Sequence, residues 1–432
     1  MNTQGKTAMS FWERVGPYTA RKNKLALGMF IVLLISYVLN AMDRQLFSIL
    51  ASDAREALGL SVPEIGLATT IFTLGMGIAA LPTGFLLARI KRKSVVLVGL
   101  VIFSAAIALT AFAQGLVDLL LYRFILGLGE SMQLTALLAI GTTYFLNHRG
   151  VAASSLNFTF GIGAIVGPNL GAVLLASHGW QFPLIAFGLS GLPIFILIAV
   201  LARSWFTEYN PAEDPAVDIK TGQGEPDAAD PAAADDPGAA SLFERGPLLL
   251  AISTAFAGLA IYGYLGLYPT YLREELDFTA GDAGFAVSLY GLGAMLSLVG
   301  GWLGDRFNFR VVLAISLGVS AISGVLLFTD IRSLSAHAIL SFVFGGAISG
   351  MVYANLSAGI IKTMKRSLAA RGSGLFVTAL YFPAAFAGFL LGWLSTTFGW
   401  TSAGFVQMGL FSIVSAALAL AARPRVVAAD VR

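Results

Sequence analysis

The 432-residue sequence contains no cysteine and little charge. Without cysteine the chain forms no disulfide and has no thiol chemistry, and it lacks the metal sites that thiolates build. Only 12% of the residues are charged and 57% are hydrophobic. A soluble domain has about 25% charged residues. The composition therefore excludes an ordinary soluble protein and predicts a chain that crosses a membrane many times.

Several functional motifs are also missing. The sequence has no phosphate-binding Gly-x-x-x-x-Gly-Lys-Ser/Thr motif, which disfavours an ATP-driven pump. It has no metal-ligand cluster and no nucleophile–base pair, which disfavours an enzyme. The net charge is only +3, and the basic residues gather in short loops, a pattern that reports membrane topology rather than nucleic-acid binding. The three histidines, His148, His178 and His337, fall near predicted loops, so none is expected to relay protons inside the membrane.

Long apolar runs, in contrast, are abundant. A run of about 20 apolar residues can cross a bilayer as a helix. Twelve such runs occur in two groups of six, and they predict an all-α membrane protein with two six-helix bundles. The predicted spans are 25–49, 63–88, 94–114, 116–140, 151–177, 181–204, 246–270, 280–304, 310–329, 334–360, 372–394 and 399–421.

The domain organisation follows from these spans. A segment rich in Pro, Ala and Asp separates the two groups and predicts a solvated, disordered linker. Lys and Arg of the short loops fall on the same side as the N-terminus, which predicts that both termini are cytoplasmic. We expect a monomer in the plasma membrane, which in a bacterium is the inner membrane. The predicted parts are an N-terminal segment 1–24, a bundle 25–204, a linker 205–245, a bundle 246–421 and a tail 422–432.

The two halves repeat each other in sequence. Similar halves of six helices are the arrangement in which a substrate binds at the midplane between them, and rocking of the halves gives alternating access. The offset between matching segments is nearly constant, which makes coincidence improbable. Gly84–Lys93 aligns with Gly301–Arg310, Arg149-Gly150 with Arg371-Gly372, and Gly179-Trp180 with Gly399-Trp400.

Four charged residues, Asp43, Arg44, Arg123 and Glu130, lie inside apolar runs of the first half. Each charge near a bilayer centre costs about 2.5–3.5 kcal/mol on insertion scales, and such residues usually face a bundle interior and mark a substrate or ion pathway. Asn40, Asp43 and Arg44 share one helix face, and Arg123 and Glu130 lie two turns apart on another. We therefore predict that these charges line a central cavity.

The four charges allow two interpretations. Their sum is zero when both acids are ionised, so they could simply form two ion pairs that join helices. Alternatively, a substrate carboxylate binds an arginine, and the acid that loses this arginine then binds a proton. Arginine suits this role because its planar guanidinium binds a carboxylate through two hydrogen bonds and stays charged. We favour the second interpretation, with Asp43 and Glu130 coupling protons and Arg44 and Arg123 binding the anion.

Other polar side chains in the spans are candidates for lining the cavity. Core packing is the simpler explanation for any single tyrosine, but as a group the tyrosines predict an aromatic second half opposite a cationic first half. Such a cavity suits a carboxylate with an apolar or aromatic body. The candidates are Asn40, Gln133 and Asn157 in the first half, and Tyr262, Tyr264, Tyr268, Tyr290, Tyr353, Asn355 and Tyr381 in the second.

These residues and motifs resemble the major facilitator superfamily over nearly the whole chain. Gly301, Asp305, Arg306 and Arg310 match its loop signature Gly-x-x-x-Asp-Arg-x-x-basic, whereas the first half has Ala88 in place of the Asp. The fourth span resembles a second motif, Arg-x-x-x-Gly-x-Gly, which begins at Arg123. The resemblance implies a cytoplasmic gate that contains Gly84, Arg89, Gly301, Asp305, Arg306 and Arg310.

The charged residues also resemble two branches of that superfamily. An Asp-Arg pair followed by Arg and Glu seven residues apart is similar to the anion:cation symporters, which move organic acids with protons. That resemblance implies that Asp43 and Glu130 are the proton-carrying acids. The runs Met42–Arg44 and Gly127–Ser131 are also similar to Spinster-type transporters, which export lipid-like molecules.

The function that these patterns predict is symport of a small organic anion with protons. The proton gradient would supply the energy, and no cofactor is expected. Two alternatives stay open from the sequence. One is a proton-driven exporter of an amphipathic molecule, and the other is a membrane sensor or scaffold that transports nothing.

Overall fold

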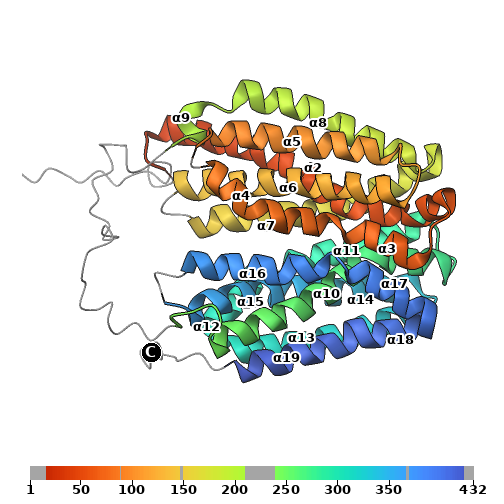
Figure 1. Cartoon of the computed structure of the whole chain (residues 1–432). Coiled ribbons are helices and arrows are strands. Elements are labelled where there is room, and N and C mark those ends of the chain that lie inside the picture. The colour runs from red at the N-terminus through yellow and green to blue at the C-terminus, as the bar shows by residue number, and fades with distance from the viewer. Residues whose placement is uncertain (1–15, 88, 146–148, 210–238, 366–368, 423–432) are drawn as a thin grey trace, which may run out of the picture.

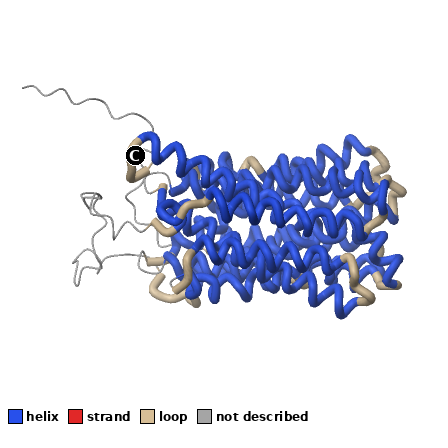
Figure 2. Tube along the Cα trace, turned by 90° about the horizontal axis from the view of Figure 1, so that it is seen from above, coloured by secondary structure: helices blue, strands red, loops and turns tan. Residues whose placement is uncertain are grey.

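The computed structural model describes residues 16–87, 89–145, 149–209, 239–365 and 369–422. Within these ranges, twelve helical segments are long and apolar enough to cross a membrane, which confirms the predicted all-α fold. The segments form two bundles that lie one above the other in Figure 1. Seen at right angles, the helices run side by side, with loops at two opposite ends (Figure 2). Most of the predicted linker and tail lies outside the described residues.

The first bundle begins with a helix longer than the predicted span, α2. This helix ends at Gly59, whose φ of +64° is the left-handed conformation that glycine adopts readily at a helix C-terminus. The next helix starts at once, because Ser61 and Glu64 form a capping box around its first turn. The helices of this bundle are α2 (Ala20–Leu58), α3 (Val62–Thr70), α4 (Phe72–Leu87), α5 (Arg92–Thr110), α6 (Leu116–Tyr144), α7 (Arg149–His178), α8 (Gln181–Leu201) and α9 (Ser204–Thr207).

The second bundle contains more interruptions within its spans. Two of its spans are divided into two helices each, and two others contain a stretch of π-helix. The elements are α10 (Arg245–Glu274), α11 (Ala280–Ala294), α12 (Ser297–Arg306), α13 (Phe309–Leu327), α14 (Leu334–Gly345), η3 (Gly346–Val352), α15 (Tyr353–Thr363), α16 (Ala369–Ala384), α17 (Ala387–Phe398), α18 (Trp400–Gly404), η5 (Phe405–Leu410) and α19 (Phe411–Ala421).

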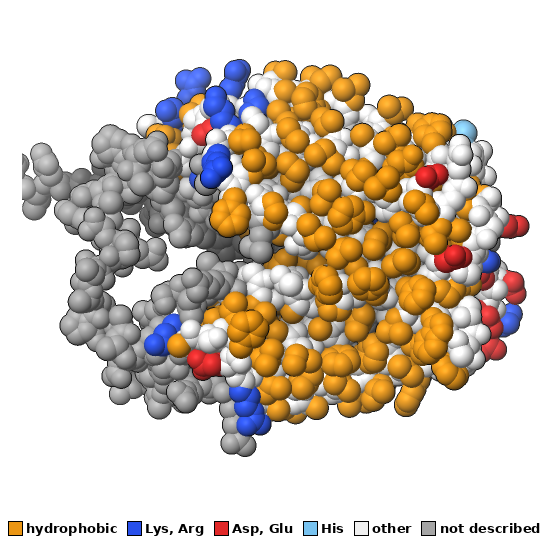
Figure 3. Space-filling model, viewed as in Figure 1, with side chains coloured by type: hydrophobic (Ala, Val, Ile, Leu, Met, Phe, Trp, Pro, Cys, Tyr) orange, Lys and Arg blue, Asp and Glu red, His pale blue; other side chains and the backbone are white. Residues whose placement is uncertain are grey.

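Charged side chains gather at the two ends of the molecule, and hydrophobic side chains cover the middle (Figure 3). One end contains the start of α5, with the segment Lys91–Lys93, and the end of α12, with Arg306, and we call it the basic end. The opposite end contains Asp53 and Glu274, and we call it the distal end. An apolar belt between two polar ends is the surface expected of a chain that spans a bilayer.

The two bundles contact each other mainly through α3 with α17, α7 with α11, α4 with α16 and α2 with α10. Gly66 of α3 and Gly388 of α17 approach each other closely. A side chain at either glycine would collide with the backbone of the other. The two helices can therefore meet backbone to backbone only because both positions are glycine.

Ion pairs between the bundles reinforce this contact at the distal end. Arg55 of α2 binds Glu274 of α10 through two hydrogen bonds, Nε–Oε1 at 3.1 Å and Nη2–Oε2 at 3.0 Å. The neighbouring Arg273 forms an ion pair with Asp53 and donates to the carbonyl of Ile49 at 3.0 Å. The side chains of all four charged residues are partly exposed. We call these two ion pairs the distal clasp.

Reversing one charge of the distal clasp should loosen the distal end. Arg55→Glu places two carboxylates opposite each other, and an exposed pair contributes about 0.2–1 kcal/mol, so accessibility should rise by roughly 1.4- to fivefold. Alkylation of a single cysteine at Leu267, which packs against Gly66, measures the opening, because the chain has no other cysteine. The exchange Arg55→Glu with Glu274→Arg should restore the slow rate. Equal rates in the single and double variants would contradict the role of the clasp.

Candidate functional site

The four charged residues inside the membrane-spanning helices form two ion pairs that cross between α2 and α6. Arg44 of α2 pairs with Glu130 of α6, with Nε 3.0 Å from Oε2. Arg123 of α6 pairs with Asp43 of α2, with Nη1 3.2 Å from Oδ2. Each helix thus contributes one acid and one arginine. All four are buried, so neither charge of a pair could be removed without leaving the other uncompensated.

The Arg44–Glu130 pair belongs to a hydrogen-bonded network. Arg44 Nη2 donates to Asn40 Oδ1 at 3.1 Å, and Asn40 Nδ2 donates to Gln133 Oε1 at 2.9 Å. Gln133 Nε2 in turn donates to Ser36 Oγ at 3.0 Å. The structure therefore brings Asn40 and Gln133, two residues predicted from the sequence, together with this ion pair. Asn157, a weaker candidate, has a side chain outside the described part of the chain.

The Arg123–Asp43 pair is attached to an interruption in the second membrane span. That span is divided at Ile71, between α3 and α4, which frees backbone carbonyls at the end of α3. Arg123 Nε donates to Ala68 O at 3.3 Å, and Nη2 donates to Thr69 O at 3.5 Å. Arg123 thus joins Asp43 to the end of α3, which the sequence did not predict.

The guanidinium of Arg123 is also enclosed by aromatic rings. Its Cζ lies 4.5 Å from the ring centroid of Phe47 and 5.2 Å from that of Phe72. Its side chain keeps only 1% of its accessible surface. A cation over an aromatic face is stabilised by the ring quadrupole, so the cost of burying Arg123 is partly offset.

Each acid uses only one of its two oxygens. Asp43 Oδ1 and Glu130 Oε1 are buried and have no hydrogen-bond partner among the described residues. A carboxylate held this way can take up a proton on its free oxygen while the other oxygen still faces the arginine. Gln45, next to Arg44, is likewise buried with both amide atoms unpartnered in the described part of the chain. Gln45 was not among the predicted site residues.

Arg44 differs from Arg123 in its surroundings. Tyr37 of α2, Tyr381 of α16 and Tyr262 of α10 lie within electrostatic range of it, so tyrosines of both bundles are near it. Its side chain keeps 5% of its accessible surface, whereas Glu130 keeps none. Tyr37 was not among the predicted residues. Its spacing of seven from Arg44, two helical turns, was the signal that could have found it.

The predicted tyrosines of the second half divide into two groups. Tyr262 and Tyr381 lie near Arg44 with their ring centroids 5.9 Å apart, and Tyr353 interacts with Tyr381. Tyr264, in contrast, is fully buried inside the second bundle, where it stacks between Tyr268 and Tyr290 at 4.5 and 5.0 Å. The first group faces the charged residues, and the second group packs within its own bundle.

Hydrogen bonds explain why the second group stays inside the bundle. Tyr264 Oη donates to Ser341 Oγ at 2.9 Å, and Tyr290 Oη is bonded to Ser349. Tyr268 Oη lies 2.7 Å from Nδ1 of His337, which is buried in the first turn of α14 and, as predicted, lies next to a loop, where its Nε2 is 2.6 Å from Ile331 O. Asn355 Nδ2 donates to Gly300 O at 2.9 Å and so joins α15 to α12.

The predicted gate residues lie at the basic end, where no ion pair joins the two halves among the residues that the structure describes. Arg89 is exposed at the end of the second span, and Arg306 stacks over the ring of Trp302 at 5.5 Å. Added side chains at Gly84 and Gly301 would meet only open space. The backbone N–H of Arg310 binds Asn308 Oδ1 at the start of α13. Ala88 and the side chain of Asp305 lie outside the described residues.

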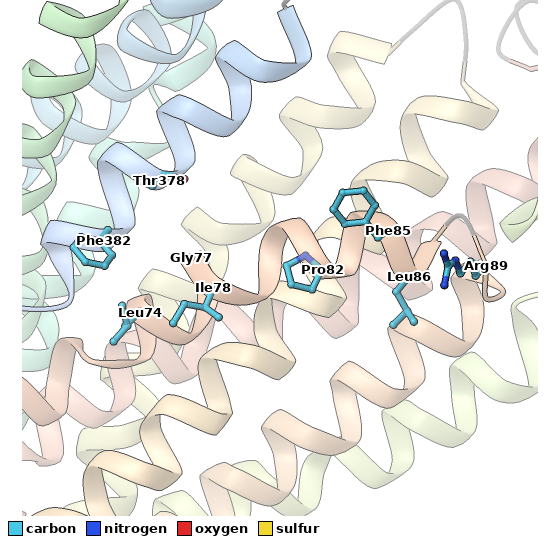
Figure 4. A pocket seen from close by; sticks show the side chains of 9 residues that line it. All are labelled: Leu74, Gly77, Ile78, Pro82, Phe85, Leu86, Arg89, Thr378 and Phe382. Carbon is cyan, nitrogen blue, oxygen red and sulfur yellow. The ribbon is translucent and has the colours of Figure 1, made fainter. Parts of the chain in front are cut away.

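A cleft of about 770 Å³ lies between parts of α4 and α16, which contact each other elsewhere along their length (Figure 4). Side chains of α4 and its following loop form one wall, and α16 contributes the facing wall. Gly77, which lines the cleft, lies next to the Cβ of Tyr381. The two bundles thus touch at the distal end and are parted along this side. The lining residues are Leu74, Gly77, Ile78, Pro82, Phe85, Leu86, Arg89, Thr378 and Phe382.

Comparisons with known proteins agree with this architecture. A bacterial homolog to the human lysosomal transporter Spinster, solved in an inward-facing and unoccupied conformation, superposes with a TM-score of 0.68. The superposition covers 92% of this chain and 95% of that one at 16% sequence identity, so it shows the shared fold.

Two curated relatives are named as transporters of organic acids. A probable L-galactonate transporter of Escherichia coli (strain K12) is 27% identical over 283 residues, which are 64% of this chain and 60% of that protein. A gallate transporter of Pseudomonas putida is 28% identical over 343 residues, 74% of each chain. The model of the Major Facilitator Superfamily matches residues 33–249 and 250–432. The chain therefore belongs to the Major Facilitator Superfamily and is a multi-pass secondary transporter, not an enzyme.

Proposed function

We propose that the protein is a proton-coupled symporter of a small organic carboxylate. The observation that supports this most directly is the Arg44–Glu130 pair. It joins a cation that retains some accessible surface to an acid whose second oxygen has no partner among the described residues. The Arg44 guanidinium can bind an anion and the Glu130 carboxylate can bind a proton. The two groups attract each other, so a change in one affects the other.

In the proposed cycle the substrate carboxylate displaces Glu130 from Arg44. The guanidinium is suited to this exchange, since it can bind a carboxylate through two parallel hydrogen bonds. Glu130 is then a buried carboxylate without its counter-charge, a state that low dielectric strongly disfavours until a proton binds. Binding of the anion thus favours binding of a proton, and the two are released together when Glu130 returns to Arg44.

The Arg123–Asp43 pair has a second role in this proposal. Arg123 is sealed by Phe47 and Phe72 and holds the end of α3, so it is poorly placed to receive a substrate. A proton on Asp43 would weaken its attraction for Arg123 and so loosen Arg123 from the interruption between α3 and α4. We propose that this pair transmits the protonation state to the helices that close the distal end.

The tyrosines around Arg44 indicate the body of the substrate. Tyr37, Tyr262 and Tyr381 offer ring faces for apolar contact and hydroxyls for hydrogen bonds. An aromatic acid or a hydroxylated sugar acid fits both properties. The relatives named for gallate and L-galactonate transport are one of each kind.

The proposed setting is the inner membrane of a bacterium, with the basic end in the cytoplasm. Short loops rich in Lys and Arg favour the cytoplasmic side. The conformation, joined at the distal end and parted at the basic end, is then an inward-facing one. We propose that a monomer suffices and that the proton gradient is the only energy source.

The cleft between α4 and α16 favours a second candidate function, export of an amphipathic molecule. Apart from Arg89 and Thr378 its walls are apolar, and Ile78, Phe85 and Phe382 are more than half exposed. An apolar tail could lie along these walls while a charged head reaches Arg44. Such a substrate would make the protein a proton-driven exporter of a lipid-like compound.

Proton movement with a panel of acids distinguishes these functions. Purified protein in sealed vesicles should alkalinise the medium when one aromatic or sugar acid is added, because proton and anion enter together. Glu130→Gln should abolish this signal while preserving substrate exchange, since Gln keeps a neutral partner for Arg44. The panel should include gallate and L-galactonate. Silence with every acid, but proton movement with a lysophospholipid, would favour the exporter instead.

The two arginines should respond differently to replacement by lysine. Arg44→Lys should weaken substrate binding by roughly ten- to 100-fold, because one charge-assisted hydrogen bond contributes about 1.5–3 kcal/mol. Arg123→Lys should mainly lower the melting temperature, because one ammonium cannot reach Asp43 and both carbonyls of α3 at once. Binding measured by isothermal titration and melting by intrinsic fluorescence separate these effects. Wild-type affinity in Arg44→Lys would exclude Arg44 as the anion ligand.

A further inference from the structure

We propose that Thr70 is a positioning residue for transport. Its side chain joins the interrupted second span, in the first bundle, to the interrupted eleventh span, in the second bundle. Thr70 is the last residue of α3, immediately before the interruption at Ile71. Its side chain is almost fully buried. The facing helices α16 and α17 are also parts of one divided span, with Ala385 and Phe386 between them.

The Thr70 hydroxyl binds two backbone groups at the interruption between α16 and α17. Its Oγ1 lies 2.8 Å from Ala385 O and accepts from Gly388 N at 3.3 Å. In an unbroken helix, Ala385 O would accept from the amide four residues later, and Gly388 N would donate to the carbonyl four residues earlier. One side chain of the first bundle therefore takes the place of two backbone partners in the second.

Competing acceptors do not remove this contact. The Thr70 hydroxyl has one proton, and Gly66 O and Leu67 O of its own helix lie 3.1 and 3.5 Å from Oγ1. Ala385 O is the nearest of the three acceptors. When the hydroxyl donates to Gly66 O instead, it still accepts from Gly388 N, so one bond between the bundles remains.

The contact exists only while the distal end is closed. It depends on the backbone approach of Gly66 to Gly388, which ends when α3 and α17 separate. Separation would leave Ala385 O and Gly388 N to find water or rebuilt helix. Since buried backbone groups without partners are costly, Thr70 selectively stabilises the distal-closed conformation.

Thr70 also lies next to the carbonyls that Arg123 binds. Arg123 holds Ala68 O and Thr69 O, and Thr70 follows directly in the chain. Protonation of Asp43 would therefore act, through Arg123, on the same turn of α3 that is hydrogen-bonded to the start of α17. This last step, from the charge pair to Thr70, rests on the proposed function, whereas the fastening by Thr70 does not.

The test compares Thr70→Val with two controls in the purified full-length protein. Thr70→Val keeps the shape and removes the hydroxyl, and Thr70→Ser keeps the hydroxyl. Thr73→Val removes a hydroxyl of equal burial that bonds only within its own span, to Thr70 O at 2.8 Å. Single cysteines at Leu267, on the distal contact, and Thr378, in the cleft, report the two ends through their alkylation rates with N-ethylmaleimide.

Thr70→Val should raise the alkylation rate at position 267 and lower that at position 378, and the ratio of the two rates should change by about tenfold, as expected for loss of one buried hydrogen-bond set. Thr70→Ser should restore both rates, and Thr73→Val should leave both unchanged. Opposite changes at the two ends report a conformational shift, whereas unfolding would raise both rates. Rates in Thr70→Val that match those of Thr73→Val would overturn the proposal.

The link to the charge pair is tested separately in the same cysteine proteins. Asp43→Asn should raise alkylation at position 267, and it should do so less in the Thr70→Val background, because both changes act on one contact. Additive effects would overturn the link through α3 while the fastening by Thr70 stands. Neither alkylation experiment needs a substrate, so both can be interpreted even if the proposed symport is wrong.

Discussion

The structure depends above all on the cost of placing charges in a medium of low dielectric. Asp43, Arg44, Arg123 and Glu130 are buried in the middle of the first bundle, and each would be strongly destabilising alone. Their crossed pairing between α2 and α6 removes most of that cost. It also fixes how these two helices face each other, because a rotation of either one would leave two acids and two arginines unpaired.

The two pairs are chemically alike but differ in what surrounds them. Arg123 is closed in by aromatic rings and backbone carbonyls, whereas Arg44 lies among tyrosines contributed by both bundles. Joining helices and binding a substrate are therefore not exclusive explanations of the four charges. The Arg123–Asp43 pair has the surroundings of a structural contact. The Arg44–Glu130 pair has those that the proposed binding site between the two bundles requires.

Two interrupted spans meet where the bundles touch, and different chemistry serves each interruption. The second span of the first bundle and the eleventh span, in the second bundle, are both divided near the bundle contact. Arg123 binds the carbonyls freed by the first interruption, and Thr70 binds the groups freed by the second. An interruption of this kind leaves backbone groups without helical partners, and at these two places side chains of other helices bind such groups.

The sequence by itself determined the twelve spans, the repeated halves and the four buried charges. Apolar length, charge cost and repetition are local properties, so they can be read without knowing which helices touch. The tertiary structure alone decided that Arg44 pairs with Glu130 and Arg123 with Asp43. It also decided that Tyr381 and the unpredicted Tyr37 lie near Arg44, while Tyr264, Tyr290 and Asn355 bond inside the second bundle. The physical reason is that helices in a membrane are apolar on nearly every side, so periodicity does not reveal which face turns toward the cavity, and packing against neighbours decides it.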